Sequence, residues 1–135
     1  MPALRRKKKA PQPPPELHEL ESEVMEEVWR RDEASVRDVT EALNRQAERP
    51  RAYTTYMTIM MRLDRKGVLQ RRREGKTDIY SPVHDRESYM ALRAESEVQA
   101  LVDQYGEVAL SHFARQVGQL DPARRRALQR LARRD

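Results

Sequence analysis

The chain has 135 residues, a net charge of +5, no cysteine, and only one Trp, one Phe and five Tyr. The missing cysteines exclude disulfides and thiolate metal sites, and no apolar run approaches the roughly 20 residues of a membrane span. This length suits one domain, or a small domain with an oligomerisation extension, and so few aromatic side chains favour a partner subunit that completes the core.

Residues 1–16 are expected to form a disordered tail. Residues 5–9 are five consecutive cations, and the proline-rich stretch after them resists both helix and sheet. Because prolines rather than an apolar segment follow the cations, this is not the pattern of a secretion signal, and we expect a cytoplasmic protein. The basic cluster either attracts phosphates without sequence preference or only solubilises the terminus.

Two amphipathic helices are predicted in the next segment. The first starts at Leu17 and stops near Asp32, and its glutamates cover the side opposite the apolar stripe. The second starts after Ser35, a favoured N-cap, with Asp38 in the capping-box position three residues later. Pro50 prevents this second helix from continuing. The apolar stripes are Leu17, Leu20, Val24, Met25, Val28 and Trp29 in the first helix and Val36, Val39, Ala42 and Leu43 in the second.

A third helix is predicted across about residues 52–66, and a β-hairpin follows it. Gly67 stands where a glycine in the left-handed conformation commonly ends a helix. Two short strands, over residues 68–73 and 77–82, flank a turn that contains Gly75. Three helices followed by a hairpin form the order of a winged helix-turn-helix, whose third helix enters the DNA major groove while the hairpin reaches a neighbouring groove or the backbone.

Residues 84–135 are predicted to be helical, without strand signals. A helix is expected to break near Gly106, and Asp121 followed by Pro122 is a strong helix start. We therefore expect a mostly α chain with a small β-hairpin wing: a tail (1–16), a winged-helix DNA-binding domain (17–83) and a helical dimerisation region (84–135). The candidates for the dimer interface are Leu92, Leu101, Val102, Leu110, Phe113 and Val117, some of which could instead fill a monomer's own core.

The charges are unevenly distributed along the chain. Residues 17–48 carry four basic against ten acidic residues, whereas residues 49–83 carry nine basic against three acidic. A solvated surface normally mixes its signs, so an acidic block beside a basic block indicates a surface oriented toward a polyanion.

The predicted third helix offers hydrogen-bonding and cationic side chains for that polyanion. Threonine hydroxyls suit phosphates or base edges, and an arginine can grip guanine with two hydrogen bonds. The candidates for major-groove contact are Arg51, Tyr53, Thr54, Thr55, Thr58 and Arg62. In the alternative interpretation, Thr54 and Thr55 only cap the helix and Tyr53 packs inside.

Four cations crowd the predicted hairpin: Arg71, Arg72, Arg73 and Lys76. In an isolated hairpin they would repel one another for no gain, whereas beside a phosphate backbone they would release counterions and add salt-dependent affinity. Successive strand residues point to opposite faces, so Arg71 and Arg73 should share one face and Arg72 the other, and the three cannot all contact DNA.

No pattern in the sequence indicates catalysis or a metal site. The histidines His18, His84 and His112 lie far apart without ligand spacing. We find no Ser-His-Asp order, no glycine-rich phosphate loop and no paired carboxylates. We therefore expect no enzyme, no cofactor and no metal.

Several segments resemble, in the same order, those of penicillinase repressors of the BlaI/MecI type. They are residues 20–25 (LESEVM), 28–29 (VW), 36–39 (VRDV), 52–63 (AYTTYMTIMMRL), 66–69 (KGVL) and 80–83 (YSPV). The resemblance is close across about residues 17–83 and loose beyond. It implies a homodimeric transcriptional repressor whose N-terminal domains bind the half-sites of a pseudo-palindromic DNA operator and whose C-terminal helices join the subunits.

The resemblance also implies a release mechanism. In this family, best known from β-lactam resistance, a membrane sensor's signal leads to cleavage in the C-terminal part, typically at an Asn–Phe pair. The single asparagine here is Asn44, and the single phenylalanine, Phe113, follows His112, so that pair is missing. Copper-responsive relatives use cysteine clusters, which this chain lacks.

Two other functions stay open at the level of the sequence. One is a winged-helix module that binds a protein rather than DNA, with the acidic first helix as its docking face. The other is a nucleoid-type DNA binder with little sequence preference. Alanine substitutions of Arg71, Arg72 and Arg73 would separate the first from a repressor, and footprinting would separate the second.

Overall fold

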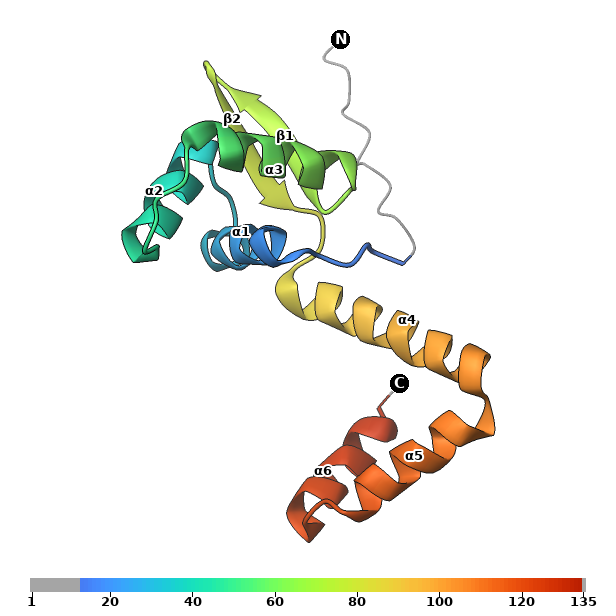
Figure 1. The fold of residues 1–135 in the computed structure, drawn as a ribbon. Helices are drawn as coiled ribbons and strands as arrows, with labels where there is room; N and C mark the ends of the chain where they lie inside the picture. Colours follow the sequence, from blue (N-terminus) through green and yellow to red (C-terminus); the bar gives the residue numbers. More distant parts are fainter. Residues whose placement is uncertain (1–12, 135) are drawn as a thin grey trace. The chain divides into compact units, whose positions relative to one another are not determined.

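The computed structural model describes residues 13–134, which divide into two compact units, the first ending at Ala94 and the second starting at Glu95. The elements are α1 (Glu19–Arg31), α2 (Val36–Gln46), α3 (Tyr53–Arg65), β1 (Leu69–Glu74), β2 (Thr77–Pro82), α4 (Arg86–Tyr105), α5 (Glu107–Gly118) and α6 (Pro122–Ala132) (Figure 1). The division falls inside α4, whereas the sequence pattern placed it after Val83. Residues 13–134 are mostly helical with one hairpin, as predicted.

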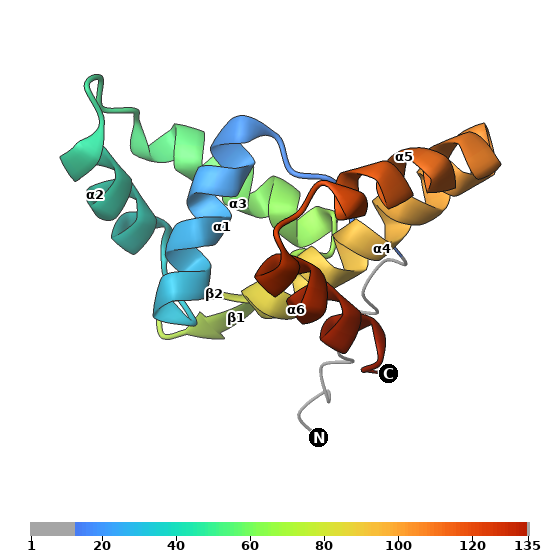
Figure 2. The same ribbon diagram turned by 90° about the horizontal axis from the view of Figure 1, so that it is seen from below.

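The core of the first unit is shared by three helices and the hairpin. Helices α1, α2 and α3 all pack against one another, and Figure 2 shows α1 crossing α3. The buried side chains are Val24, Met25, Val28, Ala34, Val36, Val39, Tyr56, Ile59, Met60, Leu63, Val68, Leu69 and Tyr80. This apolar contact buries one face of each helix and leaves the opposite face of α3 in solvent, which positions the candidate site.

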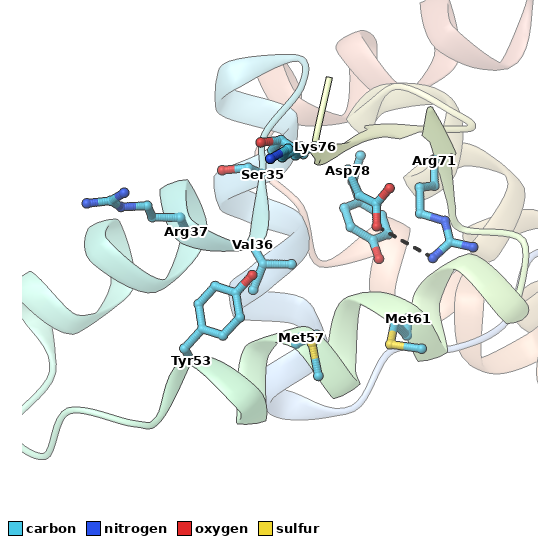
Figure 3. A pocket seen from close by; sticks show the side chains of 11 residues that line it. Ser35, Val36, Arg37, Tyr53, Met57, Met61, Arg71, Lys76 and Asp78 are labelled. Atoms are coloured by element: carbon cyan, nitrogen blue, oxygen red, sulfur yellow. Dashed lines mark ion pairs between the residues drawn. The ribbon is translucent and has the colours of Figure 1, made fainter. Parts of the chain in front are cut away.

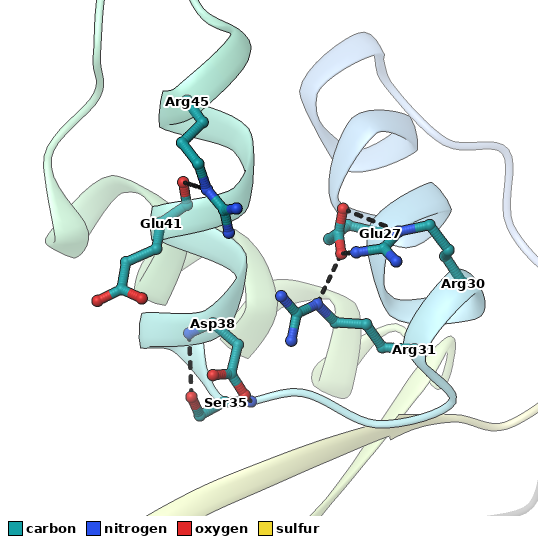
Figure 4. A network of polar contacts seen from close by, with 7 residues as sticks. All are labelled: Glu27, Arg30, Arg31, Ser35, Asp38, Glu41 and Arg45. Carbon is teal, nitrogen blue, oxygen red and sulfur yellow. Dashed lines mark hydrogen bonds and ion pairs between the residues drawn. The ribbon is translucent and has the colours of Figure 1, made fainter.

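The turn between α1 and α2 is fixed by local polar contacts (Figure 4). Helix α1 ends where Asp32 adopts a positive φ of 70°. The Asp38 N–H donates to Ser35 Oγ at 3.1 Å, and the Ser35 N–H donates to Asp38 Oδ2 at 3.0 Å. This confirms the predicted capping box, which satisfies two otherwise unpaired N–H groups at the start of α2.

The hairpin is short, tightly turned and tied to the helices. Its register runs from Leu69 opposite Pro82 to Glu74 opposite Thr77, which leaves a two-residue turn. In that turn Gly75 has a φ of 62° and Lys76 does not have a positive φ, as in a type II′ turn.

A residue before α2 extends the sheet by one bridge. Ala34 pairs with Tyr80, and each N–H donates to the other's carbonyl at 2.9 Å. This pairing, which no local sequence pattern predicts, attaches the hairpin to the segment between α1 and α2. The bridge therefore fixes the hairpin through β2.

The second unit is helical, and its apolar side chains are largely exposed. Gly106, with a φ of 59°, separates α4 from α5, and Asp121 Oδ1 accepts from the Arg124 N–H at 2.9 Å at the start of α6. Both helix boundaries were predicted. Among the described residues of this unit, Ala109 alone is buried. The unit therefore has no closed core of its own.

Two further predictions concern the N-terminal tail and the absence of a membrane-spanning segment. The predicted tail falls mostly outside the described residues, and its end is packed, because Pro14 is fully buried. Within residues 13–134, no helix combines the length and the apolar character needed to cross a membrane.

Candidate nucleic-acid interface

The start of α3 is positioned by one side chain of α2. Asn44 Nδ2 donates to the Arg51 carbonyl at 2.8 Å, and the Arg51 N–H donates to Asn44 Oδ1 at 2.9 Å. The Tyr56 hydroxyl donates to the same oxygen at 3.3 Å. Asn44 thereby satisfies both backbone groups of Arg51 and ties the turn between the helices to the first turn of α3.

The two faces of α3 differ sharply in exposure. Tyr56, Ile59, Met60 and Leu63 are buried, whereas the predicted contact residues Thr54, Thr58 and Arg62 are exposed on the other side. Arg51 is exposed and Thr55 is half-buried.

The alternative interpretation of this helix is not supported. Tyr53 is 50% exposed, so it does not pack inside. The N-cap residue is Ala52, and no side chain caps the helix. Thr54 and Thr55 are therefore available for contacts outside the chain.

A cleft of about 380 Å³ lies between the start of α2, α3 and the hairpin (Figure 3). Tyr53, Met57 and Met61 follow one another along α3 at intervals of four residues and form its apolar side. The full lining is Ser35, Val36, Arg37, Tyr53, Met57, Met61, Arg71, Lys76, Thr77, Asp78 and Tyr80. The cleft thus combines an apolar wall on the helix with cations from α2 and the hairpin.

The three hairpin arginines occupy two faces, as predicted. Arg71 and Arg73 share Asp78, with N–O distances of 3.8 and 3.2 Å. Arg72 lies on the other face and binds both carboxylate oxygens of Glu33, at 2.6 and 3.2 Å, and Glu74 at 2.9 Å.

The ion pairs of the hairpin leave its turn cationic. The hydrogen bond from Arg72 lowers the pKa of the Glu33 carboxyl below its usual value, so this pair is charged at neutral pH. Within the part of the chain that the structure describes, no ion pair involves Lys76, which is exposed in the turn. Lys76 is therefore the hairpin cation most accessible to an external anion.

Two further cations belong to this surface and were not among the predicted contact residues. Arg37 lines the cleft from the first turn of α2, where the positive end of the helix dipole also favours anions. Arg65 is exposed on α3, eleven residues after Thr54 and seven after Thr58, which is the same helical face. That spacing was the signal that could have identified Arg65.

The predicted dimer residues do not all lie together. Leu101 and Phe113 line an apolar cleft of about 410 Å³ in the second unit, with Tyr105, Val108, Ala109, His112 and Gln116. Leu110 is exposed, and Val102 and Val117 are half-buried, in the same unit but outside this cleft. Leu92 is half-buried in the first unit.

The three histidines have separate surroundings. His18 precedes α1 and its N–H donates to Glu21, the His84 carbonyl accepts from Trp29, and His112 lines the apolar cleft of the second unit. Among the described residues, no three potential ligand side chains form a group that could hold a metal.

The chain is similar to known proteins of one family. The family model of the penicillinase repressor matches residues 17–134. The transcriptional regulator BlaI of Mycobacterium tuberculosis is 40% identical over 118 residues, which cover 85% of this chain and 84% of that protein. The penicillinase repressor of Bacillus licheniformis is 28% identical over 83 residues, which cover 61% of this chain and 62% of that protein.

A solved structure resembles part of the chain. The solution structure of the DNA-binding domain of the repressor BlaI aligns with a TM-score of 0.50 and 26% identity. The alignment covers 60% of this chain and 94% of that domain.

Proposed function

The chain belongs to the penicillinase repressor family, and from this premise we propose that it is a transcriptional repressor that binds double-stranded operator DNA. Its relatives are transcriptional regulators, so it is a regulator and not an enzyme. Acting on DNA, it would work in the cytoplasm.

The observation that carries this proposal is the cleft between α3 and the hairpin. The two elements that form it suit two parts of a duplex: the exposed face of α3 fits the major groove, and the cations of the hairpin fit the phosphate backbone beside it. Thr54, Thr58 and Arg62 would read bases, and Tyr53, Thr55 and Arg51 would contact the groove wall or the backbone.

The hairpin would supply mainly salt-dependent affinity. Arg71, Arg73 and Lys76 would contact phosphates, because they share the turn or the face that lines the cleft. Arg72 would instead stay out of contact with the DNA, because Glu33 and Glu74 hold its guanidinium on the opposite face.

We further propose that two copies bind through the second unit, one DNA-binding unit per half-site. The support is the exposed apolar surface of that unit, which a second copy would bury: Leu101, Leu110 and Phe113 are each at least 40% exposed. Val102 and Val117, which are half-buried in the same unit, are further candidates for this contact. Family membership also supports release by a sensor signal, and without an Asn–Phe pair any cleavage would act at a different bond.

Footprinting the purified protein on the promoter upstream of its own coding region tests this function. We expect a discrete protected segment with two-fold symmetry. Protection without a preferred position would favour a nucleoid-type binder, and no binding at any salt concentration would favour a protein-interaction module. Replacing Arg71, Arg72 and Arg73 together by alanine should weaken binding and reduce its dependence on salt, which a protein-interaction module would not show.

A further inference from the structure

The first turns of α4 are held by the segment that precedes α1. The Tyr89 hydroxyl donates to the Pro15 carbonyl at 2.6 Å, and Arg93 Nη1 donates to the Pro14 carbonyl at 3.2 Å. Tyr89 and Arg93 are four residues apart and therefore share one face of the helix. Pro14 is fully buried and Tyr89 is 5% exposed, so this is a packed contact.

Helix α1 holds the same part of α4. The ring of Trp29 lies 5.3 Å from that of Tyr89, centroid to centroid, at a 45° tilt. Trp29 Nε1 donates to the His84 carbonyl at 2.9 Å, just before α4 begins. Both carboxylate oxygens of Glu26 accept from Arg86 Nε, at 2.9 and 3.0 Å. The start of α4 is thus bound to α1 and to residues 14–15.

Proline is suited to such a contact for two reasons. Its ring restricts φ, so the segment loses little conformational freedom when it packs. It also has no N–H that needs a partner, while its carbonyl remains free to accept the bonds from Tyr89 and Arg93. Pro14 and Pro15 precede residue 17, where the family match begins, so the proline side of this contact lies outside the matched region.

We propose that Pro14 and Pro15 form a brace that fixes the direction in which α4 leaves the DNA-binding unit, and thereby sets the separation of the half-sites that a dimer can occupy. This inference rests on the proposed function, because it requires one DNA-binding unit per half-site. Helix α4 continues without interruption to Tyr105.

The length of α4 makes the angle at its start important. At about 1.5 Å per residue, the far end of α4 lies about 24 Å beyond Tyr89. A tilt of about 8° at the start would displace that end by about 3.4 Å, which is the rise of one base pair. A small loss of restraint at Pro14 would therefore change the half-site spacing that the dimer accepts.

The first test compares single substitutions in the full chain. Pro14→Gly loosens the buried proline, Tyr89→Phe removes only the hydroxyl, and Pro13→Gly, at an exposed proline, is the matched control. Each variant is titrated with DNA that carries one half-site and with DNA that carries two half-sites at a series of separations.

Both brace variants should bind a single half-site within about twofold of the unsubstituted protein. On two half-sites at the best separation they should bind about 5- to 10-fold more weakly and depend less on separation, because the second contact loses effective concentration. The control should behave like the unsubstituted protein. Unchanged binding to two half-sites, or an equal loss on one half-site, would overturn the brace.

A second test does not use DNA. Because the chain has no cysteine, Gln46→Cys on exposed α2 allows one spin label per copy, and pulsed electron paramagnetic resonance gives the distance between the two labels in the dimer. Pro14→Gly and Tyr89→Phe should broaden this distance distribution, and Pro13→Gly should not. Equal widths, or a monomeric protein, would overturn the brace. If the protein bound no half-site DNA, the proposed function would be wrong. The distances between the labels would still test the brace.

Discussion

At the scale of single residues, the four cations of the hairpin differ in their ion-pair partners. We therefore expect them to have different roles. The guanidinium of Arg72 is bound by Glu33 and Glu74, whereas Lys76 stands exposed in the turn. Exposed ion pairs contribute little to stability. The main effect of the ion pairs of Arg72 is therefore to keep this side chain on the face away from the cleft.

Lys76→Ala and Arg72→Ala form a matched pair for testing this difference. Lys76→Ala should weaken binding to all DNA sequences alike and reduce the slope of log affinity against log salt by about 0.9. Arg72→Ala should leave that slope unchanged. Titrations at four or more salt concentrations give both slopes, and a larger effect of Arg72→Ala would show that Arg72 contacts phosphate.

Glu21 is a charged residue with a structural role. Its side chain is 2% exposed, and Lys66 Nζ donates to both carboxylate oxygens, at 2.8 and 3.0 Å. Burial alone would raise the pKa of Glu21, but the hydrogen bonds from Lys66 and from the His18 N–H outweigh it and lower the pKa below 4.5. The ion pair thus joins the start of α1 to the end of α3.

Glu21→Gln should lower the free energy of unfolding by about 1–3 kcal/mol at neutral pH, because Lys66 loses its partner. Folding lowers the pKa of Glu21. The contribution of its carboxylate to the free energy of unfolding is therefore complete above about pH 4.5 and disappears as the pH falls through the native pKa. Urea unfolding should be measured for Glu21→Gln and for the unsubstituted protein at about pH 7 and about pH 3.5. The difference between their free energies of unfolding should be smaller at the acidic pH. Glu23→Gln, at an exposed position of the same helix, is the control, and a difference independent of pH would contradict the assignment.

At the scale of elements, the turn between α2 and α3 decides how α3 is presented. The carboxamide of Asn44 makes two hydrogen bonds with the backbone of Arg51 and accepts one from Tyr56. A proline-containing turn without such a contact would have more conformations, and the first turn of α3, which carries Thr54, would be less well positioned.

Asn44→Ala should lower the free energy of unfolding by about 1–2 kcal/mol and should also weaken operator binding. The binding loss should exceed that of Gln46→Ala, an exposed polar residue two positions later on the same helix. Thermal unfolding and DNA titration at a temperature where both variants are folded measure the two effects. A variant that lost stability but kept full affinity would show that Asn44 does not position α3.

At the scale of the whole molecule, the first unit has a closed core and the second does not. Of the described residues in the second unit only Ala109 is buried, while Leu101, Val108, Leu110 and Phe113 remain exposed. Such a surface is unfavourable in water, and a second copy would bury it.

Phe113→Glu should therefore shift the protein from dimer to monomer, because a carboxylate at the apolar cleft would have to be desolvated on association. Ala114→Glu adds the same charge at an exposed neighbour outside the cleft and should leave the dimer intact. Sedimentation velocity at several protein concentrations distinguishes the two states. Dimers of equal stability in both variants would place the interface elsewhere.

The sequence alone was sufficient for the order of the helices, for most of their boundaries and for the two faces of the hairpin. The first helix starts at Glu19, two residues after the predicted start at Leu17. Apolar spacing, the Ser35–Asp38 capping box, Gly106 and the start of α6 at Asp121 all act over four residues or fewer, so they can be read without knowing the fold. The same local logic predicted the exposed threonines of α3 and the opposite placement of Arg72.

The tertiary structure alone decided which distant groups meet. The pair of Glu21 with Lys66 spans 45 residues, that of Arg72 with Glu33 spans 39, and the bond from Tyr89 to Pro15 spans 74. These contacts depend on how the packed core places whole elements beside one another, and no local periodicity specifies that placement. For this reason the last residues of the predicted tail proved to be packed against α4, and Arg72 proved to be bound by Glu33, which lies outside the hairpin.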